Sequence, residues 1–384
     1  MARCIVLAPD SFKGSLPASD VALAMENGLR RIWPDAEFHR IPMADGGEGT
    51  LDALLAVTGG KRFLASVSGA DGRPLEAAYG VLERDGKAVA VLEAAQVVGL
   101  PLAGQTWVGD RTTLGLGELL KLCLDQGIRQ FLIGVGGSST NDGGAGVLAA
   151  LGGRLLDRQG ATVAPTPKGL SELDRIDFSA LDSRLKDARI TLMSDVTNPL
   201  CGPSGATAVF GPQKGVAPQE IAQFDTWLER YAALCDAWHG QNLSAHKGAG
   251  AAGGLGYAFQ LLGADYRSGA EVVCELSGLD EVLQRADWII TGEGRSDAQT
   301  LLGKVPYVVA AHAKHFGVPV TLVSGGMDQA SLPQLAEWFD GCFSIMTGPM
   351  SLQEAMQNAS SLLSDILAQL ASFQMRVRLD RGDA

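Results

Sequence analysis

The 384-residue chain has no long apolar run, no paired cysteine motif and no excess of positive charge. A membrane-spanning helix needs roughly 18 or more consecutive apolar residues, and no segment reaches that length. The N-terminal apolar run is also too short for a signal peptide. The six cysteines are scattered without a C-x-x-C pair, as in proteins whose thiols stay reduced. We therefore predict a cytoplasmic protein with no membrane partner.

The formal net charge of −12 leaves no basic field that could neutralise the phosphates of DNA or RNA. We therefore predict that the protein has no nucleic-acid partner. This charge does not exclude a small anion, because backbone N–H groups and a few well-placed cations can bind an anion locally.

Several catalytic signatures are absent as well. The Walker A pattern G-x-x-x-x-G-K-[ST] fails because Val305 follows Gly303-Lys304. The stretch Gly292–Asp297 begins like a dinucleotide fingerprint, but Asp297 stands where the third glycine is expected. This break disfavours a nicotinamide-dependent 2-hydroxy-acid oxidoreductase. Neither H-E-x-x-H nor G-x-S-x-G occurs, so the chain lacks the usual signatures of zinc proteases and of α/β-hydrolases.

The sequence is instead rich in apolar residues and glycine. Hydrophobic residues make up 46% of the chain, and its 49 glycines cluster between apolar runs. This composition indicates well-buried cores joined by several glycine-rich loops. The length exceeds what one hydrophobic core usually serves, so two domains are expected.

The beginning and the end of the chain share one alternation of predicted strands and helices. A short continuous apolar run at 4–8 predicts a strand covered on both faces, and a second strand is predicted near 37–42. Both alternate with helices, and the same alternation returns around strands at 287–291, 318–323 and 341–345. Helices are predicted at 17–33, 51–57, 303–316, 331–338 and 351–372. This alternation is typical of a doubly wound, Rossmann-like parallel sheet.

The middle of the chain follows a different pattern. Asp85-Gly86 lies between two apolar stretches and predicts a β-hairpin, which belongs to an antiparallel or mixed sheet. We therefore predict an α/β protein with a discontinuous first domain, residues 1–65 plus 285–384. A second α/β domain with a mixed sheet, residues 66–284, is expected to be inserted between them.

The first polar loop, residues 8–15, follows the first predicted strand and carries Ser11 and Lys13. Lys13 could hold a carboxylate or a phosphate as a point charge. The alternative is a solvated Lys13, with Ser15 capping the next helix.

The second loop, residues 43–50, places Asp45 among glycines that allow a ligand to approach the backbone closely. Asp45 could orient Mg²⁺ through water or accept a hydroxyl proton. The alternative is that Asp45 only caps the helix that follows.

The third loop, residues 134–146, combines many glycines with three hydroxyl side chains. Successive small residues between a strand and a helix expose several N–H donors, which is how a phosphate cradle forms without much positive charge. Its candidate phosphate-binding residues are Ser138, Ser139, Thr140 and Asn141.

A fourth loop, residues 194–205, and a fifth loop, residues 291–297, supply charged groups. Asp195 follows a predicted strand and is a candidate general base or metal ligand, while Asn198 and Lys214 are candidates for substrate or phosphate binding. Arg295 has the planar guanidinium that suits phosphate or carboxylate, and Asp297 could share a metal ion.

Taken together, these loops resemble the bacterial glycerate kinase family of the glycerate 2-kinase type. The resemblance spans most of the chain, in family order, through the stretches Ala8–Ser15, Pro42–Thr50, Gly134–Gly146, Asp195–Ala206, Phe210–Gly215 and Thr291–Lys304. It implies ATP- and Mg²⁺-dependent phosphorylation of D-glycerate, usually at the 2-hydroxyl. It also implies two α/β domains around an active-site cleft.

The roles of individual residues follow as hypotheses. The 134–146 loop is expected to hold the nucleotide phosphates, with Lys13 or Arg295 adding positive charge. Metal binding and hydroxyl activation would be divided among Asp45, Asp195 and Asp297, which are the candidate catalytic carboxylates alongside Lys13. One of Lys13, Lys214 and Arg295 should hold the glycerate carboxylate.

Alternatives remain open at this point. The product could be 3-phosphoglycerate instead of 2-phosphoglycerate, and the protein could form a homodimer. A non-catalytic sensor of organic acids or nucleotides is the main rival from another class. Its weakness is the number of carboxylates in these loops, which would repel an anionic ligand.

Overall fold

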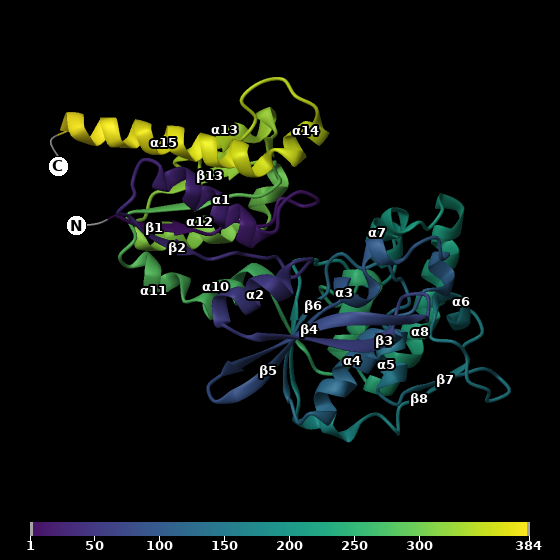
Figure 1. The fold of residues 1–384 in the computed structure, drawn as a ribbon. Coiled ribbons are helices and arrows are strands. Elements are labelled where there is room, and N and C mark those ends of the chain that lie inside the picture. Colours follow the sequence, from purple (N-terminus) through teal and green to yellow (C-terminus); the bar gives the residue numbers. More distant parts are fainter. Residues whose placement is uncertain (1–2, 382–384) are drawn as a thin grey trace. The chain divides into compact units, whose positions relative to one another are not determined.

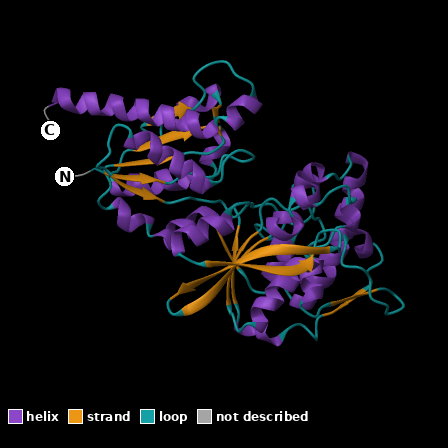
Figure 2. Ribbon diagram, viewed as in Figure 1, coloured by secondary structure: helices purple, strands orange, loops and turns teal. Residues whose placement is uncertain are grey.

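The computed structural model describes residues 3–381, which divide into two compact units (Figures 1 and 2). Unit 1 comprises Met1–Asp45, Asp52–Thr58 and Ala270–Ala384, and unit 2 comprises Gly46–Leu51 and Gly59–Gly269. The expected domain boundaries at residues 65 and 285 lie on the C-terminal side of these divisions. That the units are independent domains, and that they enclose a cleft, stay predictions.

Unit 1 contains a five-stranded sheet in which every pairing is parallel. In sheet order its strands are β15 (Gly341–Ser344), β13 (Val320–Ser324), β11 (Trp288–Thr291), β1 (Cys4–Leu7) and β2 (Glu37–Arg40). The α/β alternation predicted from both ends of the chain is therefore confirmed. Strands β1, β11 and β13 are buried along their whole length, as expected for central parallel strands covered by helices.

The helices of unit 1 bury apolar faces against this sheet. Helix α1 (Ala18–Arg30) places Met25 and Leu29 in one core with Leu363 and Leu367 of α15 (Ala359–Arg381). Figure 1 shows α15 lying along α1. The remaining helices are α10 (Gly269–Ser277), α11 (Leu279–Leu283), α12 (Val305–Phe316), α13 (Leu332–Leu335) and α14 (Leu352–Gln357), while α2 (Thr50–Thr58) crosses the unit division.

Two predicted helices of unit 1 differ from the structure. The helix expected at 331–338 is reduced to the single turn α13. The helix expected at 351–372 is divided into α14 and α15 at Asn358, which ends α14 outside helical geometry. Ser351 starts α14 through a capping box with Glu354, so this short helix has its own N-terminal signal.

Unit 2 contains a six-stranded mixed sheet. In sheet order its strands are β10 (Asp265–Arg267), β9 (Arg189–Met193), β6 (Gln130–Gly134), β5 (Lys87–Glu93), β4 (Pro74–Arg84) and β3 (Lys61–Ser68). The hairpin predicted at Asp85-Gly86 is confirmed between β4 and β5, where both turn residues have positive φ. The edge strand β3 lies across the expected boundary at residue 66.

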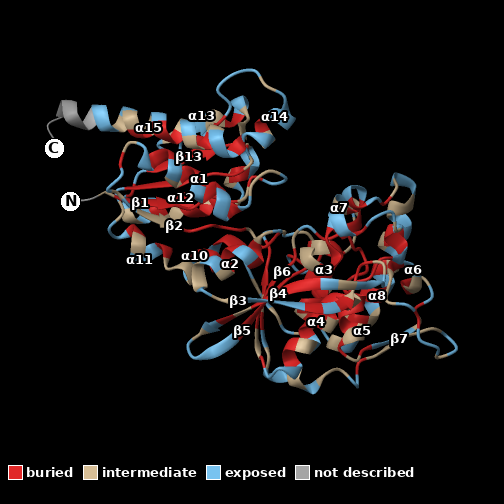
Figure 3. Ribbon diagram, viewed as in Figure 1, coloured by how far each residue is buried: buried red, intermediate tan, exposed pale blue. Residues whose placement is uncertain are grey.

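Unit 2 also contains several helices and the small antiparallel ribbon of β7 (Arg154–Leu156) and β8 (Arg175–Asp177). Its helices are α3 (Ala95–Val98), α4 (Leu114–Asp125), α5 (Ala145–Ala150), α6 (Pro167–Leu170), α7 (Ala206–Lys214), α8 (Ile221–His239) and α9 (Leu255–Leu261). Buried residues concentrate on the strands and inner helix faces of each unit (Figure 3). Among the described residues, no helix is both long and apolar enough to cross a bilayer.

Candidate active site

The larger cavity, about 600 Å³, lies in unit 1 at the carboxyl ends of the parallel strands. The loops after β1, β11, β13 and β15 all contribute to its wall, which is where open α/β sheets bind ligands. Its charged and hydroxyl-bearing lining residues are Asp10, Ser11, Lys13, Ser15, Asp45, Glu293, Arg295 and Lys304. The first, second and fifth predicted loops thus meet around one cavity.

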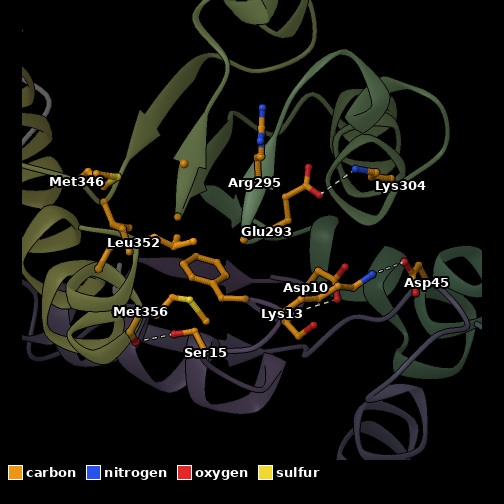
Figure 4. Close-up of a pocket in the computed structure, with 18 residues that line it drawn as sticks. Asp10, Lys13, Ser15, Asp45, Glu293, Arg295, Lys304, Met346, Leu352 and Met356 are labelled. Atoms are coloured by element: carbon orange, nitrogen blue, oxygen red, sulfur yellow. Dashed lines mark hydrogen bonds and ion pairs between the residues drawn. The ribbon is translucent and has the colours of Figure 1, made fainter. Parts of the chain in front are cut away.

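The cavity also has a large apolar lining. Its apolar side chains are Phe12, Ile345, Met346, Leu352, Ala355, Met356 and Ala359. Figure 4 shows Met346, Leu352 and Met356 on the side away from Asp10, Lys13 and Asp45. Leu352 keeps 76% of its surface exposed. The cavity therefore has one apolar side and one charged side.

Asp10 is the most deeply buried charged group on the charged side, with 6% of its surface exposed. Its Oδ1 accepts a hydrogen bond of 2.6 Å from the backbone N–H of Ser11. Burial, and next the negative charge of Asp45, raise the pKa of Asp10 to about 7, while Lys13 opposes the rise. A carboxyl group with this pKa changes its charge near neutral pH.

Lys13 and Asp45 form an ion pair across this cavity wall. Lys13 Nζ lies 3.3 Å from Asp45 Oδ2, and the Lys13 side chain is 63% exposed. The Asp45 charge is the main cause of the raised pKa of Lys13. Ser15 does not cap α1, because its hydroxyl donates to the carbonyl oxygen of Met356 at 2.7 Å and Pro17 stands at the cap position.

Glu293 adds a buried carboxylate from the fifth loop. Its Oε1 accepts hydrogen bonds from the hydroxyls of Ser296 (3.1 Å) and Thr300 (2.6 Å), and its Oε2 lies 3.6 Å from Lys304 Nζ. Burial raises the pKa of Glu293, and these partners oppose the rise. The Arg295 side chain lines the same cavity and is 76% exposed.

Asp297 occupies a different position from its neighbours in the fifth loop. Its Oδ1 accepts a hydrogen bond of 2.8 Å from the backbone N–H of Gln299, and it begins the short helix Ala298–Leu301 as its N-cap. Its Oδ2 lies 4.0 Å from Arg295 Nε. Among the described residues that line the two cavities, neither Asp297 nor Asp195 is present.

The 134–146 loop in unit 2 is packed tightly against its own unit. Gly136 lies so close to the backbone of Gly47 that an added Cβ would be 2.6 Å from the Gly47 Cα. The Ser139 hydroxyl donates to the carbonyl oxygen of Val98 at 2.8 Å, and Asn141 Nδ2 donates to the Thr207 hydroxyl at 2.8 Å. Both side chains are completely buried, so they stabilise the loop.

A carboxylate that the sequence analysis did not select holds the end of this loop. Asp142 is completely buried and accepts hydrogen bonds from the backbone N–H and hydroxyl of Thr113 at 2.8 and 2.7 Å. It also accepts from the backbone N–H groups of Gly144 and Gly146. The loop is therefore rigid in its C-terminal half.

A second, smaller cavity of about 130 Å³ lies in unit 2. It is lined by Leu100, Val135, Gly136, Gly137, Ser138, Ser194, Val196, Phe210, Gln213, Lys214 and Ala252. Apart from Leu100 and Ala252, these residues come from the loops after the adjacent parallel strands β6 and β9 and from α7. Of the predicted residues, Ser138 and Lys214 are brought together here.

Lys214 is the only lysine or arginine among the described residues of this smaller cavity wall, and only 4% of its surface is exposed. Its Nζ donates to the hydroxyl of Ser138 at 3.3 Å and to the carbonyl oxygen of Thr140 at 2.7 Å. Burial lowers the pKa of Lys214 to about 7; the Asp142 charge opposes this shift and the Arg111 charge adds to it.

Arg111 was missed by the sequence analysis. Its guanidinium is buried and donates to the carbonyl oxygens of Thr106 (2.9 Å), Ser139 (3.0 Å) and Lys214 (2.9 Å). The only sequence signal was the short polar run Asp110–Thr113 between apolar segments. Asp10, Glu293 and Lys304 lay inside quoted loops, but nothing in the sequence indicated which of the loop carboxylates would be buried.

Asp195 and Asn198 lie in the loop after β9. Asp195 is exposed and stands between Ser194 and Val196, which both line the smaller cavity. The Asn198 side chain donates to the carbonyl oxygen of Ser204 at 2.8 Å and so closes this loop on itself.

One group of potential metal ligands lies elsewhere. Among the described residues, Cys4, Glu37 and His39 form the only set of three whose ligand atoms lie within 4.8 Å of one another. Arg285 Nη1 already pairs with Glu37 at 2.9 Å, and Arg285 Nη2 lies 3.0 Å from His39 Nε2. A thiol, an imidazole and a nearby guanidinium do not suit Mg²⁺, which prefers oxygen ligands.

Comparison with known proteins assigns the chain to a family. The model of the glycerate kinase family matches residues 5–375. The chain is 41% identical to a glycerate kinase of Bacillus subtilis (strain 168) over 96% of this chain and 97% of that protein. It is 42% identical to a glycerate 2-kinase of Escherichia coli (strain K12), over 92% and 93%.

A solved structure agrees with this match. The crystal structure assigned to glycerate kinase 2 of Salmonella typhimurium LT2 is 42% identical and aligns with a TM-score of 0.84, over 98% of this chain and 99% of that one. Family model, relatives and structure all extend over nearly the whole chain. The chain therefore belongs to the glycerate kinase family, and it is an enzyme of the phosphotransferase class.

Proposed function

We propose that this enzyme transfers the γ-phosphoryl group of ATP to the 2-hydroxyl of D-glycerate and releases 2-phosphoglycerate and ADP. The regiochemistry is supported by the relative from Escherichia coli that is named a glycerate 2-kinase. Transfer to the 3-hydroxyl, giving 3-phosphoglycerate, is the alternative product. The cytoplasmic location expected from the sequence remains part of this proposal, and a homodimer is one option for the oligomeric state.

The observation that carries the proposal is the two-sided cavity of unit 1. Its volume of about 600 Å³ lies in the range of small-molecule sites. A nucleotide has an apolar, planar base at one end and a chain of phosphates at the other. The wall around Met346, Leu352 and Met356 suits the base, and Lys13 and Arg295 suit the phosphates.

The carboxylates of this cavity fit a magnesium ion. Asp10, Asp45 and Glu293 line this cavity, although among the described residues their ligand atoms do not all lie within 4.8 Å of one another. Mg²⁺ usually binds one or two carboxylates together with substrate phosphates, so one or two of these residues would hold it. When bound, the ion would neutralise charge on the phosphate oxygens. This set replaces Asp297 as our preferred ligand group, since an Asp297 oxygen already caps a helix.

Asp195 remains our candidate for the group that receives the hydroxyl proton. The glycerate oxygen forms a bond to the γ-phosphorus, the bond from that phosphorus to the β-phosphate oxygen breaks, and the hydroxyl proton passes to the Asp195 carboxylate. Phosphoryl transfer depends mainly on positioning and charge neutralisation, so Asp195 would orient the hydroxyl as much as deprotonate it. Its exposure beside two residues of the smaller cavity supports this role.

The direct test is a reaction of purified protein with ATP, Mg²⁺ and D-glycerate, followed by mass spectrometry and phosphorus NMR. We expect ADP and a phosphomonoester whose NMR couplings identify 2-phosphoglycerate. Couplings of 3-phosphoglycerate would correct the regiochemistry. ATP binding without any phosphoglycerate would reject glycerate as the acceptor, and binding of neither compound would favour the sensor.

A further inference from the structure

The most unusual charge in the molecule is the ammonium group of Lys214. It is buried, and among the described residues no carboxylate lies within ion-pair distance of it. Its hydrogen-bond acceptors are the neutral oxygen atoms of Ser138 and Thr140. A buried ammonium without a counter-charge is costly, because it has lost its hydration and gained no opposite charge.

The nearby charges do not remove this cost. Asp142 is the closest influence of opposite sign, but its oxygens accept hydrogen bonds from Thr113, Gly144 and Gly146. Arg111 is a second buried cation, and one of its hydrogen bonds goes to the Lys214 carbonyl oxygen. Of these three buried groups, Lys214 and Arg111 are cations and only Asp142 is a carboxylate. This local excess of positive charge contrasts with the net charge of −12 of the whole protein.

Lys214 also faces a cavity of a restricted size. The space bounded by Lys214, Ser138 and Ser194 has a volume of about 130 Å³. A three-carbon hydroxy acid has this size, whereas a nucleotide needs a cavity such as the one of about 600 Å³ in unit 1.

We infer that Lys214, together with the hydroxyl of Ser138, holds the carboxylate of the hydroxy-acid substrate in the smaller cavity of unit 2. This inference rests on the proposed function and decides between the three cations that the sequence left open. Lys13 and Arg295 are 63% and 76% exposed, so water screens their charges. A charge-assisted hydrogen bond is stronger where water is excluded, which favours Lys214 as the carboxylate ligand.

The assignment changes the expected role of the 134–146 loop. The sequence analysis gave this loop the nucleotide phosphates, whereas the cavity volume and the buried cation favour the acceptor substrate. Ser139 and Asn141 then act as positioning residues that fix the loop from inside the unit. The lowered pKa of Lys214 agrees with this role, because a bound carboxylate would stabilise the charged form and take up a proton.

The test is the variant Lys214→Met, which keeps the length of the side chain and removes its charge. We expect the KM for D-glycerate to rise about 10- to 100-fold, as for the loss of one hydrogen bond to a charged group. The KM for ATP should change less than about twofold. The matched control Lys186→Met removes an exposed lysine from the same unit and should change neither constant.

A neutral analogue of the substrate gives a readout that a merely structural role would not move. Wild-type enzyme should prefer D-glycerate to glyceramide in kcat/KM, since the amide carries no charge. In Lys214→Met this preference should largely disappear. An unchanged preference, or a rise in the KM for ATP alone, would overturn the inference. The 134–146 loop would then be assigned to the nucleotide phosphates again.

Two measurements keep the test decisive if Lys214→Met does not fold. Ser138→Ala should raise the KM for D-glycerate about three- to tenfold, because one neutral hydrogen bond is lost. Calorimetry of the wild-type protein with D-glycerate at pH 8, in buffers of different ionisation enthalpy, should show proton uptake. No uptake, with normal binding, would contradict the inference. If the wild type makes no phosphoglycerate, the proposed function fails, and this calorimetry still decides whether glycerate binds there.

Discussion

The two cavities differ in volume, in polarity and in whether their cations are paired with carboxylates. The cavity of unit 1 has an apolar side, and on its charged side the cations Lys13 and Lys304 pair with carboxylates. The cavity of unit 2 is about a fifth of that volume, 130 against 600 Å³, and contains a buried ammonium without such a pair. Paired and exposed charges suit a large ligand that brings its own cation, whereas an unpaired buried charge suits one small anion.

The comparison also shows that similar loops serve different ends. Glycine-rich segments follow parallel strands in both units. In unit 1 the loop after β11 orients Glu293 and Arg295 along a cavity, whereas in unit 2 the loop after β6 buries Ser139 and Asn141 within its own fold. Glycine content alone therefore indicates close packing as readily as ligand binding.

Among the variants that test this difference between the two cavities, Asp195→Asn is expected to have the largest effect. Removal of the proton acceptor beside the smaller cavity should lower kcat by about 10²- to 10³-fold, within the usual range for general base catalysis. Nucleotide affinity should stay unchanged, because the proposed nucleotide cavity lies in the other unit. Steady-state kinetics and ATP titration measure both quantities. Asp187→Asn, an exposed carboxylate of the same unit, is the control, and near-normal turnover of Asp195→Asn would exclude Asp195 as the base.

An intermediate effect concerns the pH dependence of the free energy of unfolding, which should have opposite signs for the two cavities. Lys214 has a folded pKa lowered from 10.5 to about 7, so the unfolded chain binds the extra proton between these values. Its contribution should therefore make stability rise with pH from about 7 to 10.5, by at most about 1.4 kcal/mol per pH unit.

Asp10 should show the reverse in the absence of metal. Its folded pKa is raised from 3.8 to about 7, so the folded chain binds the extra proton and stability should fall as pH rises through that window. Urea unfolding of the wild type, Lys214→Met and Asp10→Asn in EDTA isolates each contribution by difference. Differences that do not vary with pH would show that neither buried group titrates as described.

The smallest effect is expected from the apolar wall. Leu352→Ala should weaken ATP binding about three- to fivefold, because part of an apolar contact to the base is lost. The melting temperature should hardly change, since Leu352 is 76% exposed in the protein without ligand. Leu302→Ala is a matched control, with 78% exposure and no place on the cavity wall among the described residues. Equal ATP affinities of the two variants would show that the nucleotide base does not bind against this wall.

Most of the regular structure could be predicted from local patterns. The buried strands at both ends of the chain were evident because parallel strands covered on both faces are continuous apolar runs. The Asp85-Gly86 hairpin was evident because that dipeptide readily adopts positive φ. Strand β3 was not predicted, since only Ala65 and Val67 of its eight residues are buried and the pattern gives little signal.

The candidate residues could be located by loop but not ranked within a loop. Lys13, Asp45 and Arg295 were selected and do line one cavity, and Ser138 and Lys214 line the other. Asp10 and Glu293 were passed over, although burial makes them the more perturbed carboxyl groups. Burial depends on residues far apart in the chain, which a local pattern cannot supply.

The sequence by itself determined the α/β class, the family and the loops that carry polar groups, because periodicity and turn residues are local and the motifs occur in order along the chain. Tertiary structure alone decided which of those groups are desolvated. Arg111, Asp142 and Lys214 are separated by up to 103 residues, yet they are buried together around one loop. Removal from water sets their pKa values, and only the packed fold determines which side chains lose that water.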